Sequence, residues 1–252
     1  MIIIKNKSSI LKMQQAGKLL SEIFDELPSL IKPSVDTLSI NTWIADQLKL
    51  KGLVSSSKGY TGYKYESCIS LNDEVIHGVP SSGKILKEGD LVKIDICASY
   101  RGYCADMARS LFVIQPPSVE AKKLVDVAQY ALDTGISMAR AGNHLSDISA
   151  AIQRVVEGDG FGIIRDFAGH GIGKNLHEDP EIPNYGKPGQ GPVLRPGMAL
   201  AIEPMITAGS NKVFVDKDGW TVKTVDKDLA AHVEDTVIVT DGEPDIITRK
   251  KD

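Results

Sequence analysis

Acidic residues stand at equivalent places in two similar halves of this sequence. In each half, two segments with apolar residues at helical spacing precede a segment rich in strands and turns. Three pairs of residues are separated by the same 108 positions: Gly52 and Gly160, Gly89 and Gly197, Asp95 and Glu203. A duplicated chain buries a shared face along its pseudo-twofold axis, so we expect Asp95 and Glu203 to approach each other there. Chance similarity between the halves is the alternative interpretation.

The apolar pattern predicts an α+β protein. We expect four helices, at 8–27, 40–52, 124–136 and 145–155, with Ser8 or Ser9 as the cap of the first. We also expect short strands at 68–71 and 75–76, and a hairpin that pairs 91–96 with 106–114 around a turn at 101–102. The apolar residues 1–4 precede Lys5 without the small-residue cleavage site of a signal peptide. We expect them to begin an edge strand.

Composition excludes several classes of partner. The 252 residues are 42% hydrophobic, and 29 Lys and Arg against 33 Asp and Glu give a formal net charge of -4. This balance gives no electrostatic reason to expect a nucleic acid or a membrane as partner, and no apolar run approaches the roughly 18 residues of a membrane span. Cys68, Cys97 and Cys104 are too few for a disulfide framework, and their odd number suits a reducing compartment. We therefore expect a cytoplasmic protein.

Four carboxylates lie in apolar, strand-like surroundings. Asp95 stands within the apolar segment 91–96, where a lone carboxylate is costly to bury unless it meets a cation or strong donors. The same pattern recurs at Asp106, Glu203 and Glu234. A structural ion pair would explain one such acid. Four of them without matching buried Lys or Arg require positive charge from elsewhere.

One imidazole completes this set of donors. His170 stands in the glycine-rich segment 168–173, where close backbone approach favours a positioned side chain. Carboxylates with one imidazole and no thiolate suit Mn, Co, Fe or Zn ions. Two ions share four carboxylates only if some carboxylates bridge, at a separation of roughly 3.5–4 Å. His144 and His232 have no comparable context, and we interpret them as ordinary exposed histidines.

These residues stand in motifs that resemble those of the type I methionine aminopeptidases of the bacterial type, and the likeness covers nearly the whole chain. The most specific segments are 68–72, 75–80, 89–95, 169–173, 177–180, 202–205 and 218–224. The resemblance implies an α+β pita-bread fold, in which helices cover a curved antiparallel sheet made of two pseudo-symmetric halves. One catalytic domain would span residues 1–252, with halves at about 8–115 and 118–248.

The same resemblance assigns five residues to a centre of two divalent metal ions, Co, Mn, Fe or Zn. It implies that Asp95 binds one ion through both carboxylate oxygens and that Asp106 and Glu234 bridge the two ions. His170 and Glu203 would complete the coordination of the second ion, and Glu203 would also transfer protons during the reaction. A metal-bound water or hydroxide would be the nucleophile.

Further residues are implied for the substrate. His77 and His177 match the family's non-ligand histidines, which hydrogen-bond the substrate amide and stabilise the developing oxyanion. The pocket for the methionine side chain corresponds to Tyr60, Tyr63, Cys68, Leu176 and Trp220. The sequence departs from the family pattern where it has Ser57 for a cysteine, Lys64 and Tyr65 for an aromatic-proline pair, Leu176 for a phenylalanine, and Asp235 for a histidine.

The resemblance implies removal of the initiator methionine from nascent chains with a small second residue, by a monomer working near the ribosome. A proline-directed aminopeptidase of the same fold is one alternative, although such enzymes usually carry an additional N-terminal domain. A catalytically silent pita-bread protein that binds partners is another, although such proteins lose metal ligands. All five ligands are present here, which favours the first activity.

Overall fold

Four α-helices form in the part of the chain that the computed structural model describes, residues 1–250. They are α1 (Lys7–Glu26), α2 (Thr37–Leu50), α3 (Val119–Ser137) and α4 (Leu145–Gly158), with 3-10 turns η1 (Leu27–Ser29) and η2 (Tyr60–Gly62). They confirm the four predicted helices. Asn6 caps α1, because its side chain accepts a hydrogen bond from the backbone N–H of Ser9, so the predicted caps Ser8 and Ser9 are wrong. The predicted domain also includes 251–252, which lie outside the described residues.

Most strands belong to one large antiparallel sheet. The strands are β1 (Val54–Ser55), β2 (Cys68–Leu71), β3 (Glu74–Ile76), β4 (Leu91–Tyr100), β5 (Tyr103–Phe112), β6 (Gly162–Ile163), β7 (Ala168–Gly171), β8 (Glu178–Pro183), β9 (Ala199–Ile202), β10 (Met205–Thr207), β11 (Val213–Val215), β12 (Val222–Thr224), β13 (Ala230–His232), β14 (Glu234–Ile238) and β15 (Asp245–Ile246). The sheet has the order β1-β4-β5-β14-β9-β7-β8, with β2 beside β4 and β15 beside β14. Two three-stranded sheets, β13-β10-β6 and β11-β12-β3, complete the fold.

The predicted hairpin is the longest pairing in the sheet. β4 and β5 pair from Leu91 with Phe112 to Tyr100 with Tyr103. Arg101 and Gly102 form the turn with φ of 49° and 76°, the positive values that tight hairpin turns require. Both strands run further toward the turn than predicted.

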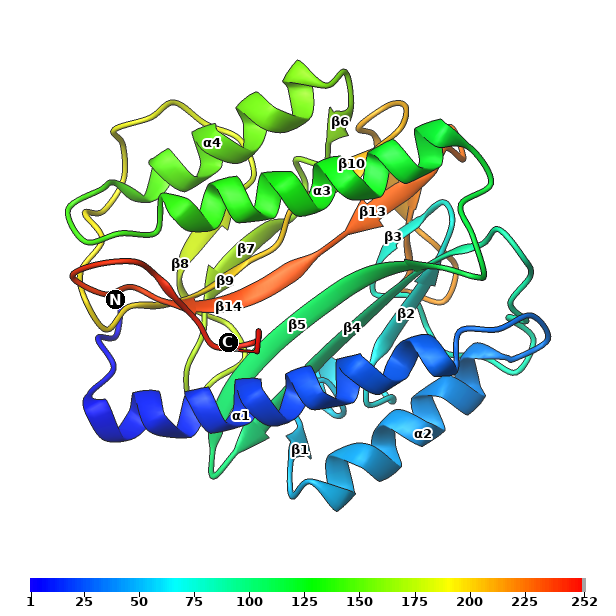
Figure 1. Cartoon of the computed structure of the whole chain (residues 1–252), viewed down its shortest axis with the longest axis horizontal. Coiled ribbons are helices and arrows are strands. Elements are labelled where there is room, and N and C mark those ends of the chain that lie inside the picture. The colour runs from blue at the N-terminus through cyan, green and yellow to red at the C-terminus, as the bar shows by residue number, and fades with distance from the viewer. Residues whose placement is uncertain (251–252) are drawn as a thin grey trace.

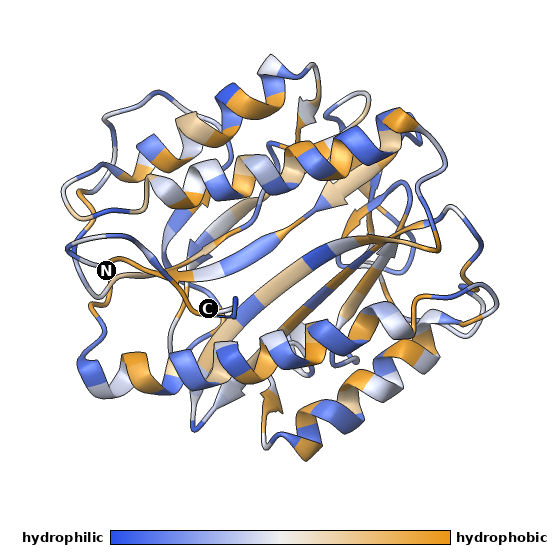
Figure 2. Cartoon of the chain, viewed as in Figure 1, coloured by the Kyte–Doolittle hydropathy of each residue, from blue (hydrophilic) through white to orange (hydrophobic). Residues whose placement is uncertain are grey.

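Two pairs of helices cover the sheet, one pair over each half (Figure 1). Leu20 of α1 packs in one core cluster with Ile94 of β4 and Met107 of β5. Leu132 of α3 packs in a second cluster with Val237 of β14. Apolar residues alternate with polar ones around the helices, as expected for helices with one buried face (Figure 2). The adjacent strands β4-β5-β14-β9 thus contain the place where the two halves of the sheet join.

The glycines that mark the predicted repeat have matching conformations. Gly52 and Gly160 each follow a helix by two residues, with φ of 68° and 86°. Gly89 and Gly197 each precede a central strand by two residues, with φ of 86° and 87°. These left-handed values are accessible to glycine at little cost, which explains the choice of residue at all four places. Descent of the two halves from one duplicated unit stays a prediction.

The N-terminal residues do not form the predicted edge strand. Residues 1–4 have no strand partner, and one backbone hydrogen bond, from the N–H of Lys5 to the carbonyl of Gly197, ties this segment to the sheet. The buried Lys5 ammonium pairs with Glu178 at 2.7 Å. A buried ion pair thus holds the segment, and it brings together residues that are 173 positions apart.

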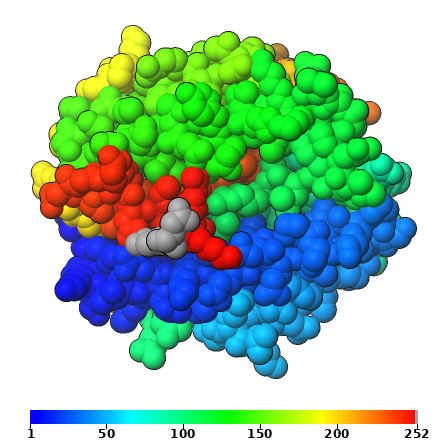
Figure 3. Space-filling view, in the orientation of Figure 1, coloured from blue at the N-terminus to red at the C-terminus, as the bar shows by residue number. Residues whose placement is uncertain are grey.

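The last described residues lie on the surface between the two helix pairs, seen as the red segment between blue α1 and green α3 (Figure 3). Arg249 pairs with Asp133 of α3 at 2.6 Å, and Lys250 pairs with Asp25 of α1 at 2.6 Å. The C-terminal segment thus joins the helix layers of the two halves. Among the described residues, no helix is both long and apolar enough to cross a membrane.

Candidate metal centre

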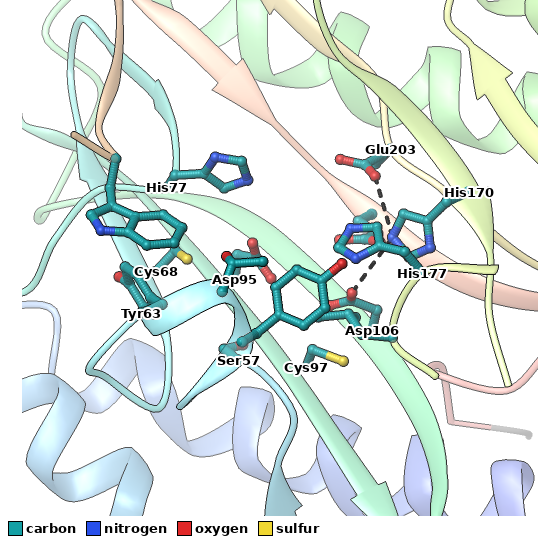
Figure 4. Close-up of a pocket in the computed structure, with 15 residues that line it drawn as sticks. Ser57, Tyr63, Cys68, His77, Asp95, Cys97, Asp106, His170, His177 and Glu203 are labelled. Carbon is teal, nitrogen blue, oxygen red and sulfur yellow. Dashed lines mark ion pairs between the residues drawn. The ribbon is translucent and has the colours of Figure 1, made fainter. Parts of the chain in front are cut away.

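Four adjacent strands each bring one carboxylate to a common pocket. Asp95 lies on β4, Asp106 on β5 and Glu234 begins β14, while Glu203 directly follows β9. Side chains alternate between the two faces of a strand. Ile94 of β4 and Met107 of β5 pack in the core cluster with α1, so the adjacent Asp95 and Asp106 face the other side of the sheet. The four predicted acids therefore meet where the two halves of the sheet join (Figure 4).

His170 of β7 completes the predicted set of ligands. Its Nε2 lies 3.9 Å from Asp106 Oδ2 and 3.7 Å from Glu203 Oε1 (Figure 4). Its Nδ1 lies 2.9 Å from the Gly171 carbonyl oxygen. A carbonyl only accepts, so Nδ1 carries the proton and Nε2 presents a lone pair to the carboxylates. This arrangement is typical of a metal-binding histidine.

Burial makes this cluster of acids unfavourable without a cation. Desolvation, together with repulsion from neighbouring carboxylates, raises the pKa values of Asp95 and Glu234 well above their usual range and that of Asp106 to about 7. Desolvation raises the pKa of Glu203 to about 8. Glu234 Oε1 is buried and accepts no hydrogen bond within residues 1–250. Such a cluster needs positive charge from outside the chain.

A buried lysine on the same strand does not supply that charge. Lys93 of β4 is 1% exposed and stands two positions before Asp95. Its Nζ donates to the carbonyl of Asn72 at 2.8 Å, and burial lowers its pKa to about 7. No Lys or Arg among the described residues forms an ion pair with any of the four carboxylates.

The donor set fits divalent metal ions. Two groups of three side chains could each hold an ion, because one ligand atom from every member lies within 4.8 Å of the other two. The first group is Asp106, His170 and Glu234, and the second is Glu203, His232 and Glu234. Carboxylate oxygens with imidazole nitrogen suit Mn, Co, Fe or Zn. Glu234 belongs to both groups, so it stands between two candidate positions for an ion.

The wall beside Asp95 is aromatic and apolar. Tyr63 is 5% exposed, and its ring meets that of Trp220 edge to face, with centroids 5.1 Å apart. Its hydroxyl donates to the carbonyls of Ser67 and Gly78, at 3.1 and 3.2 Å, which fixes the ring. The remaining predicted pocket residues, Tyr60, Cys68 and Leu176, line the same pocket, with Ser57, Thr61 and Cys97 beside them.

His77 and His177 also line this pocket (Figure 4). His77 has a φ of 58°, a conformation that costs a non-glycine residue about 1–2 kcal/mol and often marks a functional site. Burial lowers its pKa to about 4, and burial also lowers the pKa of His177. The His177 ring lies 4.2 Å from that of His170 and 5.0 Å from that of Tyr60, measured between centroids. Both imidazoles are therefore neutral near pH 7. The part that each pocket residue plays stays a prediction.

The interpretation of His232 as an ordinary exposed histidine is wrong. Its side chain is buried in the site, and its Nε2 lies 3.3 Å from Glu203 Oε2. The sequence held a signal for this position, because residues two apart on an extended chain share a face and Glu234 follows two residues later. His144 is half-buried and caps α4, where its backbone N–H donates to Asp147.

Known proteins match this chain along almost its full length. The model of metallopeptidase family M24 matches residues 11–241. The methionine aminopeptidase of Clostridium acetobutylicum is 47% identical over 248 residues, which cover 98% of this chain and 99% of the relative. The crystal structure of methionine aminopeptidase from Thermotoga maritima superposes with a TM-score of 0.97 at 44% identity, covering 99% of this chain and 100% of that one.

A solved structure of lower sequence identity shares the fold. The prolidase of Pyrococcus furiosus has a TM-score of 0.78 at 22% identity, and the match covers 99% of this chain but 66% of the prolidase. This likeness shows the pita-bread architecture alone, whereas the methionine aminopeptidases match in sequence from end to end. The chain therefore belongs to metallopeptidase family M24 and, within it, to the methionine aminopeptidases.

Proposed function

We propose that this protein is a metal-dependent aminopeptidase that removes the N-terminal methionine from peptides and nascent chains. The observation that supports this most directly is the convergence of four carboxylates and His170 on one pocket with an apolar, aromatic wall. Charged ligands and an apolar wall together suit a substrate that has a polar reacting group beside an apolar side chain.

The acids and His170 would hold two divalent cations at the join between the halves of the sheet. The residues concerned are Asp95, Asp106, His170, Glu203 and Glu234. When bound, the cations would supply Lewis acidity toward a water molecule and toward the scissile carbonyl. The two groups of possible ligand atoms that share Glu234 support two ions in preference to one. The donor set accommodates Co, Mn, Fe or Zn.

Glu203 and two histidines would act on the substrate directly. The Glu203 carboxylate keeps some exposure to the pocket, so it can take a proton from the attacking water and return it to the leaving amine. His77 and His177 are neutral, so their ring N–H groups would donate hydrogen bonds to the scissile amide without adding charge. The peptide C–N bond breaks as the amine receives its proton.

The aromatic wall would bind the methionine side chain. Tyr63 and Trp220 present ring faces and edges, with which a thioether makes favourable contacts, and Cys68 and Leu176 extend the apolar surface. By the family resemblance we further propose a small second residue in the substrate and action near the ribosome in the cytoplasm. The same resemblance supports a monomer of one domain, with halves at about 8–115 and 118–248.

A panel of three peptides tests this function. Purified protein with added Mn or Co should release free methionine from Met-Ala-Ser, and about a hundredfold more slowly from Met-Leu-Ser, as measured by chromatography of the released amino acid. Asp106→Asn should abolish release, and the surface variant Asp133→Asn should not. Turnover of Ala-Pro-Ser but not of Met-Ala-Ser would identify a proline-directed enzyme. Absence of turnover on every peptide with either metal would identify a silent binding protein.

A further inference from the structure

A buried ion pair lies directly beside His177, one of the two histidines proposed to act on the substrate. Glu178 follows His177 in the chain, and its carboxylate Oε2 accepts a hydrogen bond from Lys5 Nζ at 2.7 Å. The side chains of Lys5 and Glu178 are 3% and 5% exposed, so both charges are withdrawn from water. The attraction between two such charges does little more than offset the cost of removing them from water. The conformation that the pair fixes is therefore a better explanation for it than stability alone.

The Glu178 carboxylate closes the loop that carries His177. Residues 172–177 connect β7 to β8, and Glu178 is the first residue of β8. Glu178 Oε1 accepts a hydrogen bond from the backbone N–H of Asn175 at 3.2 Å. The two residues between these hydrogen-bonded groups are Leu176 and His177, and both line the pocket. The carboxylate thus spans the part of the loop that faces the metal centre.

Lys5 attaches this carboxylate to the rest of the molecule. Its backbone N–H donates to the carbonyl of Gly197 at 2.8 Å, in the turn that precedes β9. Its ammonium also donates to the Ile3 carbonyl at 3.0 Å, which fixes the direction of the side chain. The loop packs closely on that side chain, because a Cβ at Gly173 would lie 2.7 Å from Lys5 Cε. One residue thus links the loop of His177 to the central strand β9.

We propose that Lys5 is a positioning residue for His177. Its ammonium fixes the Glu178 carboxylate, and the carboxylate holds the loop so that the imidazole faces the pocket. The inference rests on the proposed peptide cleavage, in which His177 donates a hydrogen bond to the scissile amide. Misplacement of a reacting group by about 1 Å can lower a rate on the order of 100-fold. Because the hydrogen bond from His177 would strengthen in the transition state, loss of Lys5 should affect kcat more than KM.

Histidine NMR of the chelated protein tests the position of the ring without any turnover. The chain has five histidines, so each imidazole signal can be assigned by substituting them one at a time. Lys5→Met should shift or broaden the His177 signal, because the unpaired Glu178 carboxylate moves toward water and opens the loop. The matched control Lys122→Met, which removes the exposed partner of Asp126, should leave that signal unchanged. An unchanged His177 signal in Lys5→Met would overturn the proposal.

Kinetics on Met-Ala-Ser with added Mn test the consequence for the reaction. Lys5→Met should lower kcat about 10- to 100-fold while KM changes by less than about threefold, and Lys122→Met should change neither. His177→Ala should also lower kcat, and adding Lys5→Met to it should cause less than about a twofold further loss, because the ring to be positioned is absent. An equal loss from Lys5→Met with and without His177 would show a general structural role and overturn the proposal. A wild type that releases no methionine would refute the proposed cleavage, and the NMR result would then decide the role of Lys5.

A second variant keeps the test valid if Lys5→Met does not fold. Lys5→Met combined with Glu178→Met removes both charges, and apolar replacement of a buried ion pair often preserves stability. This double variant still lacks the acceptor for the Asn175 N–H, so it should fold but keep a displaced His177 signal and a low kcat. A double variant with the melting temperature, His177 signal and kcat of the wild type would overturn the proposal.

Discussion

Replacing Asp235 with alanine should destabilise the protein strongly, although Asp235 lies outside the pocket. The residue follows Glu234 on β14 and is completely buried. Its carboxylate accepts hydrogen bonds from Arg109 Nη2, Thr248 Oγ1 and Arg249 Nε, each at 2.7 Å. It therefore ties β14 to β5 and to the C-terminal segment directly behind one of the proposed ligands.

The size of the effect follows from what the substitution leaves behind. The side chains of Arg109 and Arg249 are 19% and 31% exposed, so both guanidinium groups lose a buried counter-charge and regain little water. Removing one partner of a buried ion pair costs about 3–5 kcal/mol, and the residual exposure of both arginines favours the lower end, about 3 kcal/mol. Asp133→Ala removes only the half-exposed partner of Arg249 and should cost less than about 1 kcal/mol.

Urea unfolding of both variants at one fixed metal concentration measures the difference. The free energy of unfolding should fall by about 3 kcal/mol in Asp235→Ala, while its slope against urea concentration stays unchanged. The free energy of unfolding of Asp235→Asn should lie between those of the wild type and Asp235→Ala. A loss below about 1 kcal/mol in Asp235→Ala, or one equal to that of Asp133→Ala, would refute the reasoning.

Two further predictions concern pH and backbone packing. The chelated protein should lose stability as pH rises from about 6.5 to about 8. In this range the histidines are neutral in the unfolded chain and also in the folded one, where burial lowers the pKa values of His77, His170 and His232 to about 4. The unfolded carboxyls have released their protons, whereas folded Asp106 and Glu203 retain theirs to about 7 and 8. Melting curves with and without added Mn should show this slope only in the chelated protein. Gly171→Ala would place a Cβ 2.1 Å from the Asp179 carbonyl oxygen and displace the adjacent His170, so it should weaken metal affinity in calorimetry. Gly158→Ala, which meets no atom within 4 Å, should leave affinity unchanged.

The sequence predicted those parts of the fold that depend on local pattern. Helical spacing and glycines located the four helices and the hairpin, and the shared offset of Asp95 and Glu203 indicated that the two acids meet. These features need only residues that are near in sequence or related by the repeat.

Features that depend on distant partners were missed. The ion pair of Lys5 with Glu178 removes the need for an edge strand, and no local pattern reveals a partner 173 positions away. His232 gave no motif of its own, because its enclosure comes from pairing with β10 and from Ser110, 122 positions before it. The network of Asp235 likewise depends on the C-terminal segment.

Metal dependence of peptide cleavage by variants from the two halves tests the central claim most directly. The chelated wild type should release no methionine from Met-Ala-Ser, and added Mn should restore release. Asp95→Asn on β4 and Glu203→Gln after β9 should each prevent that recovery, because both halves contribute ligands to one centre. Full activity in the presence of chelator, or normal recovery by either variant, would contradict a metal centre built where the two halves of the sheet meet.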